Sequence, residues 1–227
     1  MGGLRELVLA FTASCCVVGS VGPSRGAADP TDAEPAKDAA WQARGTAFLV
    51  APDGVLLTAY HVVAGCKVPR VEHVGGAAVV RLIAEDRADD LALIQGEVSG
   101  TILRLQDVSR TGQPVVAAGY SLAGDAADGA TITVGVVTAR QSRIVTNAHV
   151  QTGWSGGALL DQSGNVLGIV SAKTRDRTLA IPADRARDFL ARSAIHMEAT
   201  GPHKPYGSVV DLAKFAQGAI FKVTCQV

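Results

Sequence analysis

A series of short apolar runs, separated by turn-forming residues, occupies the chain from Arg44 onward. Glycine, aspartate and asparagine lie in the gaps, as in Ala-Pro-Asp-Gly at 51–54, Asp-Gly at 128–129 and Ser-Gly-Asn at 163–165. Short runs bounded by such residues are typical of β-strands joined by tight turns. We therefore expect an all-β domain, a barrel or a sandwich, with strands at 46–50, 55–59, 78–84, 91–95, 114–120, 130–140, 157–161, 166–173 and 219–225.

Helical patterns are confined to the C-terminal part of the chain. Residues 183–192 carry apolar side chains at helical spacing and follow Pro182, which suits the start of a helix. Residues 209–217 predict a second short helix before the last predicted strand. With 227 residues, of which 48% are hydrophobic and 19% charged, the chain is large enough for one all-β domain or two packed halves.

Charge gives little indication of a partner. Lys and Arg total 21, Asp and Glu total 21, and the formal net charge is zero. Binding to nucleic acid or to an anionic membrane surface depends on an excess of positive charge, and the sequence shows no run of Lys and Arg that would supply one. We expect neither of these partners. The sequence gives no indication of the oligomeric state.

The N-terminal segment is typical of an exported protein. Arg5 precedes an uncharged, largely apolar stretch at 7–23, which is shorter than the roughly 20 residues of a membrane-spanning helix and is followed by small residues. We predict a signal peptide at 1–28 and export to the bacterial periplasm or the medium, with no membrane span. A buried N-terminal helix and a lipoprotein anchored at Cys15 are the alternatives. Residues 29–43, small, charged and containing two prolines, predict a flexible leader.

The cysteine count is consistent with export. Removal of residues 1–28 also removes Cys15 and Cys16 and leaves only Cys66 and Cys225. An even number of cysteines in an exported protein favours a disulfide, here between Cys66 and Cys225. Two isolated buried thiols are the alternative reading.

Three segments carry the residues of a nucleophilic site. His61 follows a predicted strand, Asp90 directly precedes another, and Ser155 lies in Gly-Trp-Ser-Gly-Gly. A serine hydroxyl becomes a good nucleophile when a neutral imidazole takes its proton, and a carboxylate can fix the tautomer of that imidazole. We predict that His61, Asp90 and Ser155 form a catalytic triad. Asp86 and Asp89 lie close to Asp90 and are expected to be solvated instead.

The glycines around Ser155 suit an oxyanion hole, which requires a sharp turn with backbone N–H groups aimed at one point. We assign the hole to the N–H groups of Gly153 and Ser155, with that of Trp154 as a third candidate donor. The other histidines are His73, His149, His196 and His203, and no two of them have the spacing of metal ligands. We therefore predict neither a metal site nor a cofactor.

Together these segments resemble the trypsin-like serine proteases, and most closely the bacterial Deg/HtrA branch. The similar stretches are TAYHVVAG, DDLALIQ, GWSGGALLDQSGNVLGIVSA and TLAIPADRARDFL, and the likeness covers residues 44–191. It implies two packed six-stranded antiparallel β-barrels with the triad between them in a domain at 44–192, a C-terminal helix, and a tail at 193–227 packed on that domain. Trp154 departs from the family, which has Asn or Asp there, and we expect no peptide-binding PDZ domain.

The resemblance also implies a substrate pocket beside Ser155. Its walls would be His149, Val150 and Thr152 on one side and Val170, Ser171 and Ala172 on the other, closed by residues 179–181. No Asp or Glu lies between Ile144 and Leu160, so a substrate Lys or Arg would lack a partner. We expect cleavage after small or medium apolar residues. The competing interpretation is that a protonated His149 accepts an acidic side chain.

These observations predict an exported serine endopeptidase that acts on unfolded or exposed polypeptide through an acyl-enzyme. One alternative is a protein of the same fold that binds polypeptide without cleaving it, or cleaves it weakly, because Trp154 disturbs the oxyanion hole. An esterase with the same chemistry is another.

Overall fold

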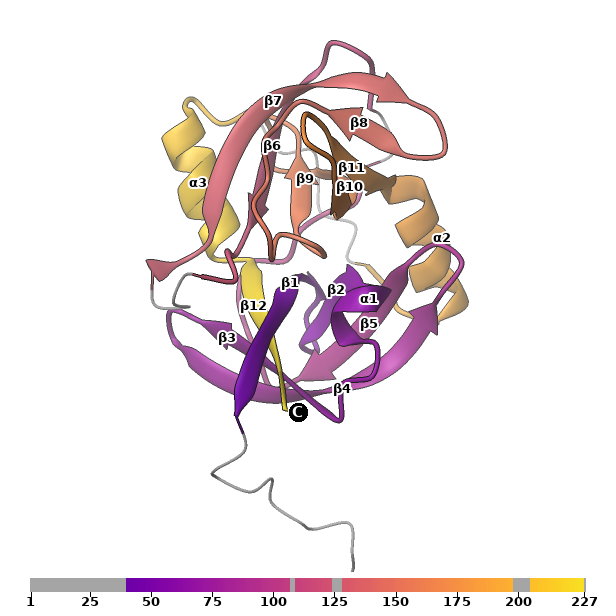
Figure 1. The fold of residues 1–227 in the computed structure, drawn as a ribbon, viewed down its shortest axis with the longest axis vertical. Coiled ribbons are helices and arrows are strands. Elements are labelled where there is room, and N and C mark those ends of the chain that lie inside the picture. The colour runs from indigo at the N-terminus through magenta and orange to yellow at the C-terminus, as the bar shows by residue number, and fades with distance from the viewer. Residues whose placement is uncertain (1–39, 107–108, 124–127, 198–204, 227) are drawn as a thin grey trace, which may run out of the picture. The chain divides into compact units, whose positions relative to one another are not determined.

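Closed β-barrels dominate the fold (Figure 1), which is taken from a computed structural model. The structure describes residues 40–106, 109–123, 128–197 and 205–226. The predicted signal peptide, the predicted leader up to residue 39, the alternative anchor Cys15 and His203 lie outside these ranges. None of the described helices is long and apolar enough to cross a membrane.

The first barrel combines the N-terminal strands with a strand from the far end of the chain. Around the barrel the order is β1-β12-β3-β4-β5-β2, and every neighbouring pair is antiparallel. A single helical turn, α1 (Tyr60–Val63), follows β2. The strands are β1 (Trp41–Ala51), β2 (Val55–Ala59), β3 (Val68–His73), β4 (Gly76–Asp86), β5 (Leu91–Gly96) and β12 (Ile220–Gln226).

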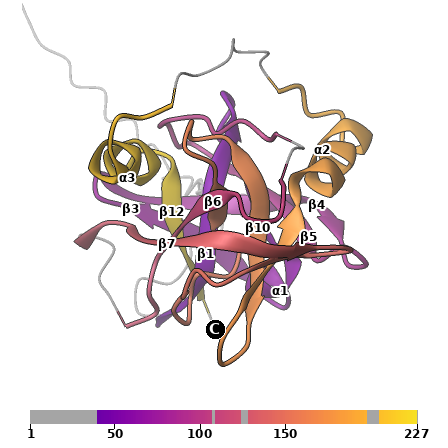
Figure 2. The same ribbon diagram turned by 90° about the horizontal axis from the view of Figure 1, so that it is seen from above.

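The second barrel has the order β10-β11-β8-β7-β6-β9, again with antiparallel neighbours. Helix α2 (Ala183–Arg192) packs on β10 and β11, and helix α3 (Val209–Gln217) packs on β7. Figures 1 and 2 show the two helices on opposite sides of this barrel. The strands are β6 (Pro114–Gly119), β7 (Thr131–Arg140), β8 (Ile144–Thr146), β9 (Ala158–Leu160), β10 (Val166–Lys173) and β11 (Thr178–Pro182).

Strand alternation produces three separate apolar cores. In β5, Ala92 and Ile94 point into the first barrel, whereas Leu91 and Leu93 join a core that also contains residues of β6, β9, β10, α2 and α3. A third core fills the second barrel. Strands with both faces covered read as continuous apolar runs, which is why the runs in the sequence do not alternate with polar residues. The core shared by both barrels holds them together.

The predicted fold class, two packed six-stranded barrels with a C-terminal helix, is confirmed. The apolar runs of the sequence did not predict the strands β3 and β8, and the strand β11 was expected only from the resemblance. Two segments lie differently from the predicted domain organisation. Residues 41–43 belong to β1 rather than to the leader. Residues 220–226 do not lie on the domain as a tail, because β12 is hydrogen-bonded between β1 and β3 and closes the first barrel.

A disulfide joins β12 to the loop that follows α1. Its partners are Cys66 and Cys225, with an S–S distance of 2.00 Å and 159 residues between them in sequence. The structure thus contains the pairing that the cysteine count favoured. Because Cys66 lies shortly after His61, the bond ties the C-terminal strand to the segment that carries this histidine.

Candidate active site

The register of two strands brings His61 and Asp90 together. In the β2–β5 pair Ala59 lies opposite Leu91, so the residues just beyond these positions are neighbours. The N–H of Tyr60 donates to the carbonyl of Asp90 at 3.0 Å, which continues the ladder by one bond. The predicted base and the predicted carboxylate therefore come from adjacent strand ends of one barrel.

Asp90 receives several hydrogen bonds. Its two carboxylate oxygens lie 3.0 and 2.9 Å from Nδ1 of His61, and the backbone N–H of His61 donates to Oδ1 at 3.0 Å. Because an ionised carboxylate only accepts hydrogen bonds, this contact places a proton on Nδ1, and in the neutral imidazole Nε2 of His61 is then the acceptor. Nε2 is then the atom that can take a proton from a nucleophile.

Two opposing effects act on the pKa of Asp90. Partial burial disfavours the charged form and raises the pKa, but the hydrogen bonds from His61 and Ser171 favour it, and together they hold the pKa of Asp90 below its ordinary value. The backbone of Asp90 is left-handed, with φ of 62°, a conformation that is uncommon outside glycine. Uncommon backbone conformations gather at functional sites.

The neighbouring carboxylates bind arginine side chains. Asp89 forms an ion pair with Arg185, and Oδ2 of Asp86 lies 2.8 Å from Arg192. Both arginines belong to α2, on the second barrel. Asp86 and Asp89 were expected to be solvated, and the structure instead shows them in ion pairs that connect the segment before Asp90 to α2.

The loop that carries Ser155 belongs to the second barrel but is bonded to the first. The N–H of Thr46 in β1 donates to the carbonyl of Ser155 at 2.8 Å. Gly156 has φ of 84°, and a Cβ there would lie 2.0 Å from the carbonyl oxygen of Thr46. Only glycine permits both this conformation and this approach. Ser155 is thereby held at the junction of the barrels.

Thr46 is fully buried and was not singled out in the sequence. Its hydroxyl donates to the carbonyl of Gly153 at 2.8 Å and accepts from the N–H of Tyr120 at 3.0 Å. Its own carbonyl accepts from the hydroxyl of Thr58 at 2.6 Å. One side chain of the first barrel thus fixes two loops of the second. No motif marks this position, since a threonine in an apolar strand is common.

Ser171 links the predicted nucleophile to the predicted carboxylate. Its hydroxyl donates to Oδ2 of Asp90 at 2.8 Å, and its carbonyl accepts from Oγ of Ser155 at 3.3 Å. Within the described ranges no hydrogen bond joins Ser155 to His61. Catalytic hydrogen bonds are often long or absent in structures without substrate. The sequence placed Ser171 in the substrate pocket and did not reveal its contact with Asp90.

Two of the three candidate oxyanion donors are available. Over the part of the chain that the structure describes, the N–H groups of Gly153 and Ser155 have no hydrogen-bond acceptor. The N–H of Trp154 is different, because it donates to the carbonyl of Gln151 at 3.3 Å. Trp154 is therefore not an oxyanion donor in this structure, and the candidate hole consists of the other two amides.

The side chain of Trp154 points into the second barrel. It is 1% exposed and belongs to the core of that barrel, where it packs with Ala148 and Leu159 among others. Gly119 provides the space, because a Cβ at this position would lie 2.9 Å from Cγ of the indole. The bulky residue before Ser155 is thus accommodated in the core and is not exposed at the site.

The predicted pocket residues divide into three groups. His149, Thr152 and Ala172 are exposed and Val150 is half-buried, so these residues can contact a substrate. Ser171 is occupied with Asp90 and Ser155. Val170 is 1% exposed and lies in the barrel core, so its side chain is not accessible to a substrate in this structure. The ladder shifts register between Val170 and Ala172, and this bulge changes the face to which the following residues point.

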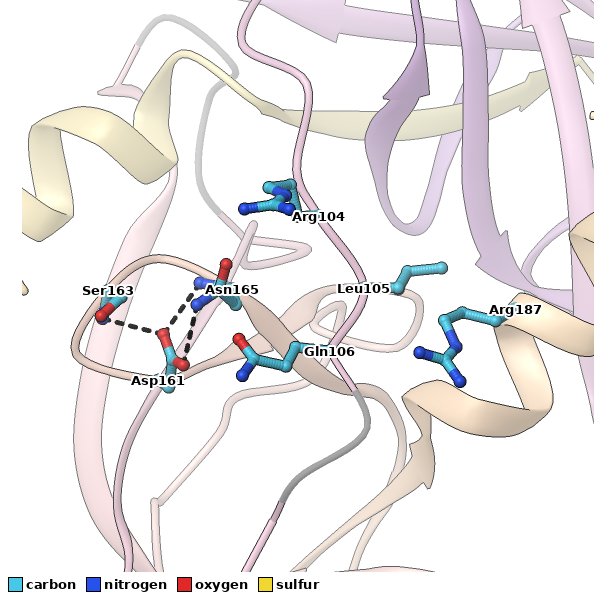
Figure 3. A pocket seen from close by; sticks show the side chains of 7 residues that line it. All are labelled: Arg104, Leu105, Gln106, Asp161, Ser163, Asn165 and Arg187. Atoms are coloured by element: carbon cyan, nitrogen blue, oxygen red, sulfur yellow. Dashed lines mark hydrogen bonds between the residues drawn. The ribbon is translucent and has the colours of Figure 1, made fainter. Parts of the chain in front are cut away.

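A hollow of about 440 Å³ lies elsewhere, lined by residues of the segment 104–106, the turn after β9 and α2 (Figure 3). Asp161 accepts hydrogen bonds there from the backbone N–H of Ser163 and from the backbone and side chain of Asn165. None of the predicted catalytic or pocket residues lines it. We assign no part of the candidate chemistry to this hollow.

Comparison with known proteins gives consistent results. The family described as "Trypsin-like peptidase domain" matches residues 45–169, more than half of the chain. Serine protease HTRA1 of Xenopus tropicalis is 34% identical over 172 residues, covering 66% of this chain and 36% of the relative. Serine protease HTRA2, mitochondrial, of Bos taurus is 33% identical over 168 residues, covering 65% and 36%.

Two further similarities extend this result. A protein of Sinorhizobium fredii with the name "Uncharacterized protein y4bJ" is 36% identical over 159 residues, covering 66% of this chain and 25% of the relative. A solved structure, "HtrA-type protease AlgW with decapeptide", superposes with a TM-score of 0.60 and 29% identity, covering 67% of this chain and 52% of that chain. The chain thus spans from a quarter to about half of the length of these proteins.

Proposed function

The chain belongs to the trypsin-like peptidase family, and we propose on that basis that it is a serine endopeptidase with Ser155 as nucleophile, His61 as base and Asp90 as the carboxylate that orients the base. One observation carries the proposal. Asp90 accepts hydrogen bonds from His61 and Ser171, while Ser171 also accepts one from Ser155, so the three predicted residues belong to one connected network at the barrel junction.

The proposed reaction begins when Ser155 Oγ attacks the carbonyl carbon of the cleaved bond and passes its proton to Nε2 of His61. The resulting imidazolium is stabilised by Asp90. The tetrahedral intermediate collapses when its C–N bond breaks and His61 returns the proton to the leaving amine. Water then attacks the acyl-enzyme, again losing a proton to His61, and the acid product leaves as Ser155 regains its proton.

The negative oxygen of the tetrahedral intermediate requires hydrogen-bond donors. The N–H groups of Gly153 and Ser155 are the proposed donors, supported by the absence of another acceptor for either group among the described residues. The bond from Thr46 to the carbonyl of Gly153 fixes the peptide plane beside these donors. Removal of one such donor costs about 10²–10³ in rate in other hydrolases.

We further propose that the substrates are polypeptides, that small or medium apolar residues precede the cleaved bond, and that the protein is exported. Val150 and Ala172 are the apolar pocket residues that remain accessible, and no carboxylate lies between Ile144 and Leu160 to accept Lys or Arg. The solved relative AlgW was determined with a decapeptide. The Cys66–Cys225 disulfide supports export, because disulfides form and persist in oxidising compartments.

The direct test is covalent labelling. A fluorophosphonate probe reacts with activated serines, so we expect peptide mapping of the labelled protein to identify Ser155. Ser155→Ala should lose both labelling and cleavage of an unfolded protein while retaining the circular dichroism spectrum of the parent. His61→Ala should lose nearly as much activity, because triad residues act as a unit. Full cleavage by Ser155→Ala would refute the assignment.

The second candidate function is polypeptide binding without cleavage. It is favoured by one observation, namely that Ser155 Oγ donates to the carbonyl of Ser171 and not to His61. If this arrangement persists with substrate bound, the hydroxyl is not activated. In that case the fluorophosphonate would leave Ser155 unlabelled, while unfolded polypeptide would still bind to the native protein.

A further inference from the structure

A second cavity lies next to the candidate site, with a volume of about 410 Å³. It is bounded by the hairpin between β10 and β11 and by the segment that precedes the Ser155 loop. Three of its lining side chains are cations and a fourth is a histidine, and none of the described residues that line it is a carboxylate. The lining residues are His149, Val150, Lys173, Thr174, Arg175, Arg177 and Thr178.

Among the described residues, the cations of this cavity have no acidic partner, unlike several other arginines. Ion pairs with Asp or Glu involve Arg70, Arg87, Arg140, Arg185 and Arg192. No ion pair or side-chain hydrogen bond of Lys173, Arg175 or Arg177 occurs within the described residues. Asp176 is the one acidic residue of the hairpin and does not line the cavity.

The fold brings together positive charges that are separated by other residues in the sequence. Lys173, Arg175 and Arg177 alternate with Thr174 and Asp176, so the hairpin shows no basic run and carries three positive charges against one negative. Along the sequence these residues therefore form no basic cluster. In the structure the three cations border one cavity together with His149.

The cavity is connected to the proposed catalytic residues through the backbone. Ser171, which binds Ser155 and Asp90, precedes Lys173 by two residues in the same strand. On the other side, the hydroxyl of Thr178 donates to the carbonyl of Ala148 at 2.6 Å and fixes the hairpin to the segment of His149. Val150 lines the cavity and is also a wall of the proposed apolar pocket, so the two sites adjoin.

We propose that this cavity is a substrate subsite that binds an acidic side chain, Asp or Glu, close to the cleaved peptide bond. The proposal rests on the proposed protease function and names a substrate class for it. A carboxylate in the cavity gains charge-assisted hydrogen bonds from lysine and arginine, whereas a substrate cation is repelled. The interaction is that of partly exposed charges, so it weakens as salt is added.

The first measurement is a cleavage profile on a peptide library, followed by a matched pair of peptides that differ only by Glu or Gln at the selected position. We expect Asp and Glu to be enriched within about four residues of the cut, and kcat/KM to be about tenfold higher for the Glu peptide. The triple variant Lys173→Gln/Arg175→Gln/Arg177→Gln should bring this ratio close to one.

A matched control removes the same charge elsewhere. Arg81, Arg110 and Lys214 are exposed and do not line the cavity, so the triple glutamine variant at these positions should keep the preference for Glu. Charge reversal excludes a structural defect as the cause. The variant Arg175→Glu/Arg177→Glu should cleave a Lys peptide better than the Gln peptide, whereas a structural defect would create no such preference. An unchanged ratio in the cavity variant, or an equal loss in the control, overturns the subsite.

A binding measurement separates this inference from the catalytic proposal. Ser155→Ala should bind a fluorescent peptide pool with a central Glu at least threefold more tightly than the matched Gln pool, measured by anisotropy. If the wild type labels at Ser155 and cleaves but shows no Glu preference in either assay, the subsite is wrong and the protease stands. If labelling fails while the pools are distinguished, the protease is wrong and the subsite stands. An oligothymidylate is an anion without carboxylate side chains. If it displaced the Glu pool as effectively as unlabelled Glu peptide does, the cavity would be a general anion site and the proposal would be overturned.

Discussion

At the scale of single residues, one buried and one half-buried hydroxyl group connect the two barrels at the candidate site. Thr46 binds the carbonyl of Gly153 and the N–H of Tyr120, and Ser171 binds Asp90 across the junction. A buried group that loses its partner keeps the cost of its desolvation. These hydroxyls are consequently expected to matter for stability as well as for the geometry of the Ser155 loop.

Thr46→Val tests this role, because valine has the shape of threonine without its hydroxyl. The substitution leaves the carbonyl of Gly153 and the N–H of Tyr120 unpaired, and each orphan costs about 1–3 kcal/mol of unfolding free energy. Urea denaturation measures the loss. Thr46→Ser keeps the hydroxyl and is the matched control, from which we expect a smaller effect. A Val variant as stable as the parent, together with a destabilised Ser variant, would show that packing of the methyl group matters and the hydrogen bonds do not.

Asp90 makes the free energy of unfolding depend on pH in the acid range. Its pKa is lowered by the folded structure, so its ionised form stabilises the protein above the unfolded pKa, about 3.9, and this contribution is lost as pH falls through the lower folded pKa. We expect the difference in unfolding free energy between the parent and Asp90→Asn to be constant near neutral pH and to shrink below about pH 4. A difference that grows on acidification would mean that the folded structure raises this pKa instead.

At the scale of secondary-structure elements, α2 holds the segment that leads to Asp90. Arg185 and Arg192 lie on one helix of the second barrel and bind Asp89 and Asp86 of the first. Partly exposed ion pairs contribute little to stability, about 0–1 kcal/mol each. Their expected effect is on the position of Asp90 and hence of His61.

The double variant Arg185→Ala/Arg192→Ala should therefore lower kcat several-fold with only a small change in the unfolding midpoint. Arg140→Ala is the control, since Arg140 also binds α2, through Asp184 at 3.1 Å, and no ion pair or hydrogen bond links it to the Asp86–Asp90 segment among the contacts of the described residues. We expect this control to keep the kcat of the parent. A proportional loss of stability and activity in the double variant would indicate general unfolding and no positioning role.

Much of the element pattern was predictable, because apolar runs between turn residues mark most of the strands and both long helices. The strands β3 and β8 were not predicted because neither consists of a long apolar run between turn residues. β3 mixes charged residues with apolar ones in VPRVEH, and β8 has only three residues. The burial of the Val170 side chain was not predictable from the resemblance, because it depends on the local ladder, which shifts register beside Ser171. The contacts of Thr46 and Ser171 join distant segments, which local pattern does not reveal.

At the scale of the whole molecule, the Cys66–Cys225 bond closes a loop that spans most of the two barrels. In the chain-entropy account such a long loop stabilises by about 3–5 kcal/mol. We expect Cys66→Ala/Cys225→Ala to unfold at a correspondingly lower denaturant concentration. A reducing agent should lower the midpoint of the parent toward that of the variant and leave the variant unchanged. Equal midpoints for parent and variant without reductant would show that the disulfide does not stabilise the fold.

The place of β12 in the first barrel has a consequence for the order in which the protein can mature. Synthesis produces β1 to β5 early, yet their barrel lacks a wall between β1 and β3 until residues 220–226 have left the ribosome. Long-range pairings of this kind form late, because the intervening chain must first be drawn together. The half of the molecule that holds His61 and Asp90 is thus completed after the half that holds Ser155. If Ser155 is the nucleophile and His61 its base, as proposed, a nascent chain has the barrel of the nucleophile before it has the complete barrel of the base.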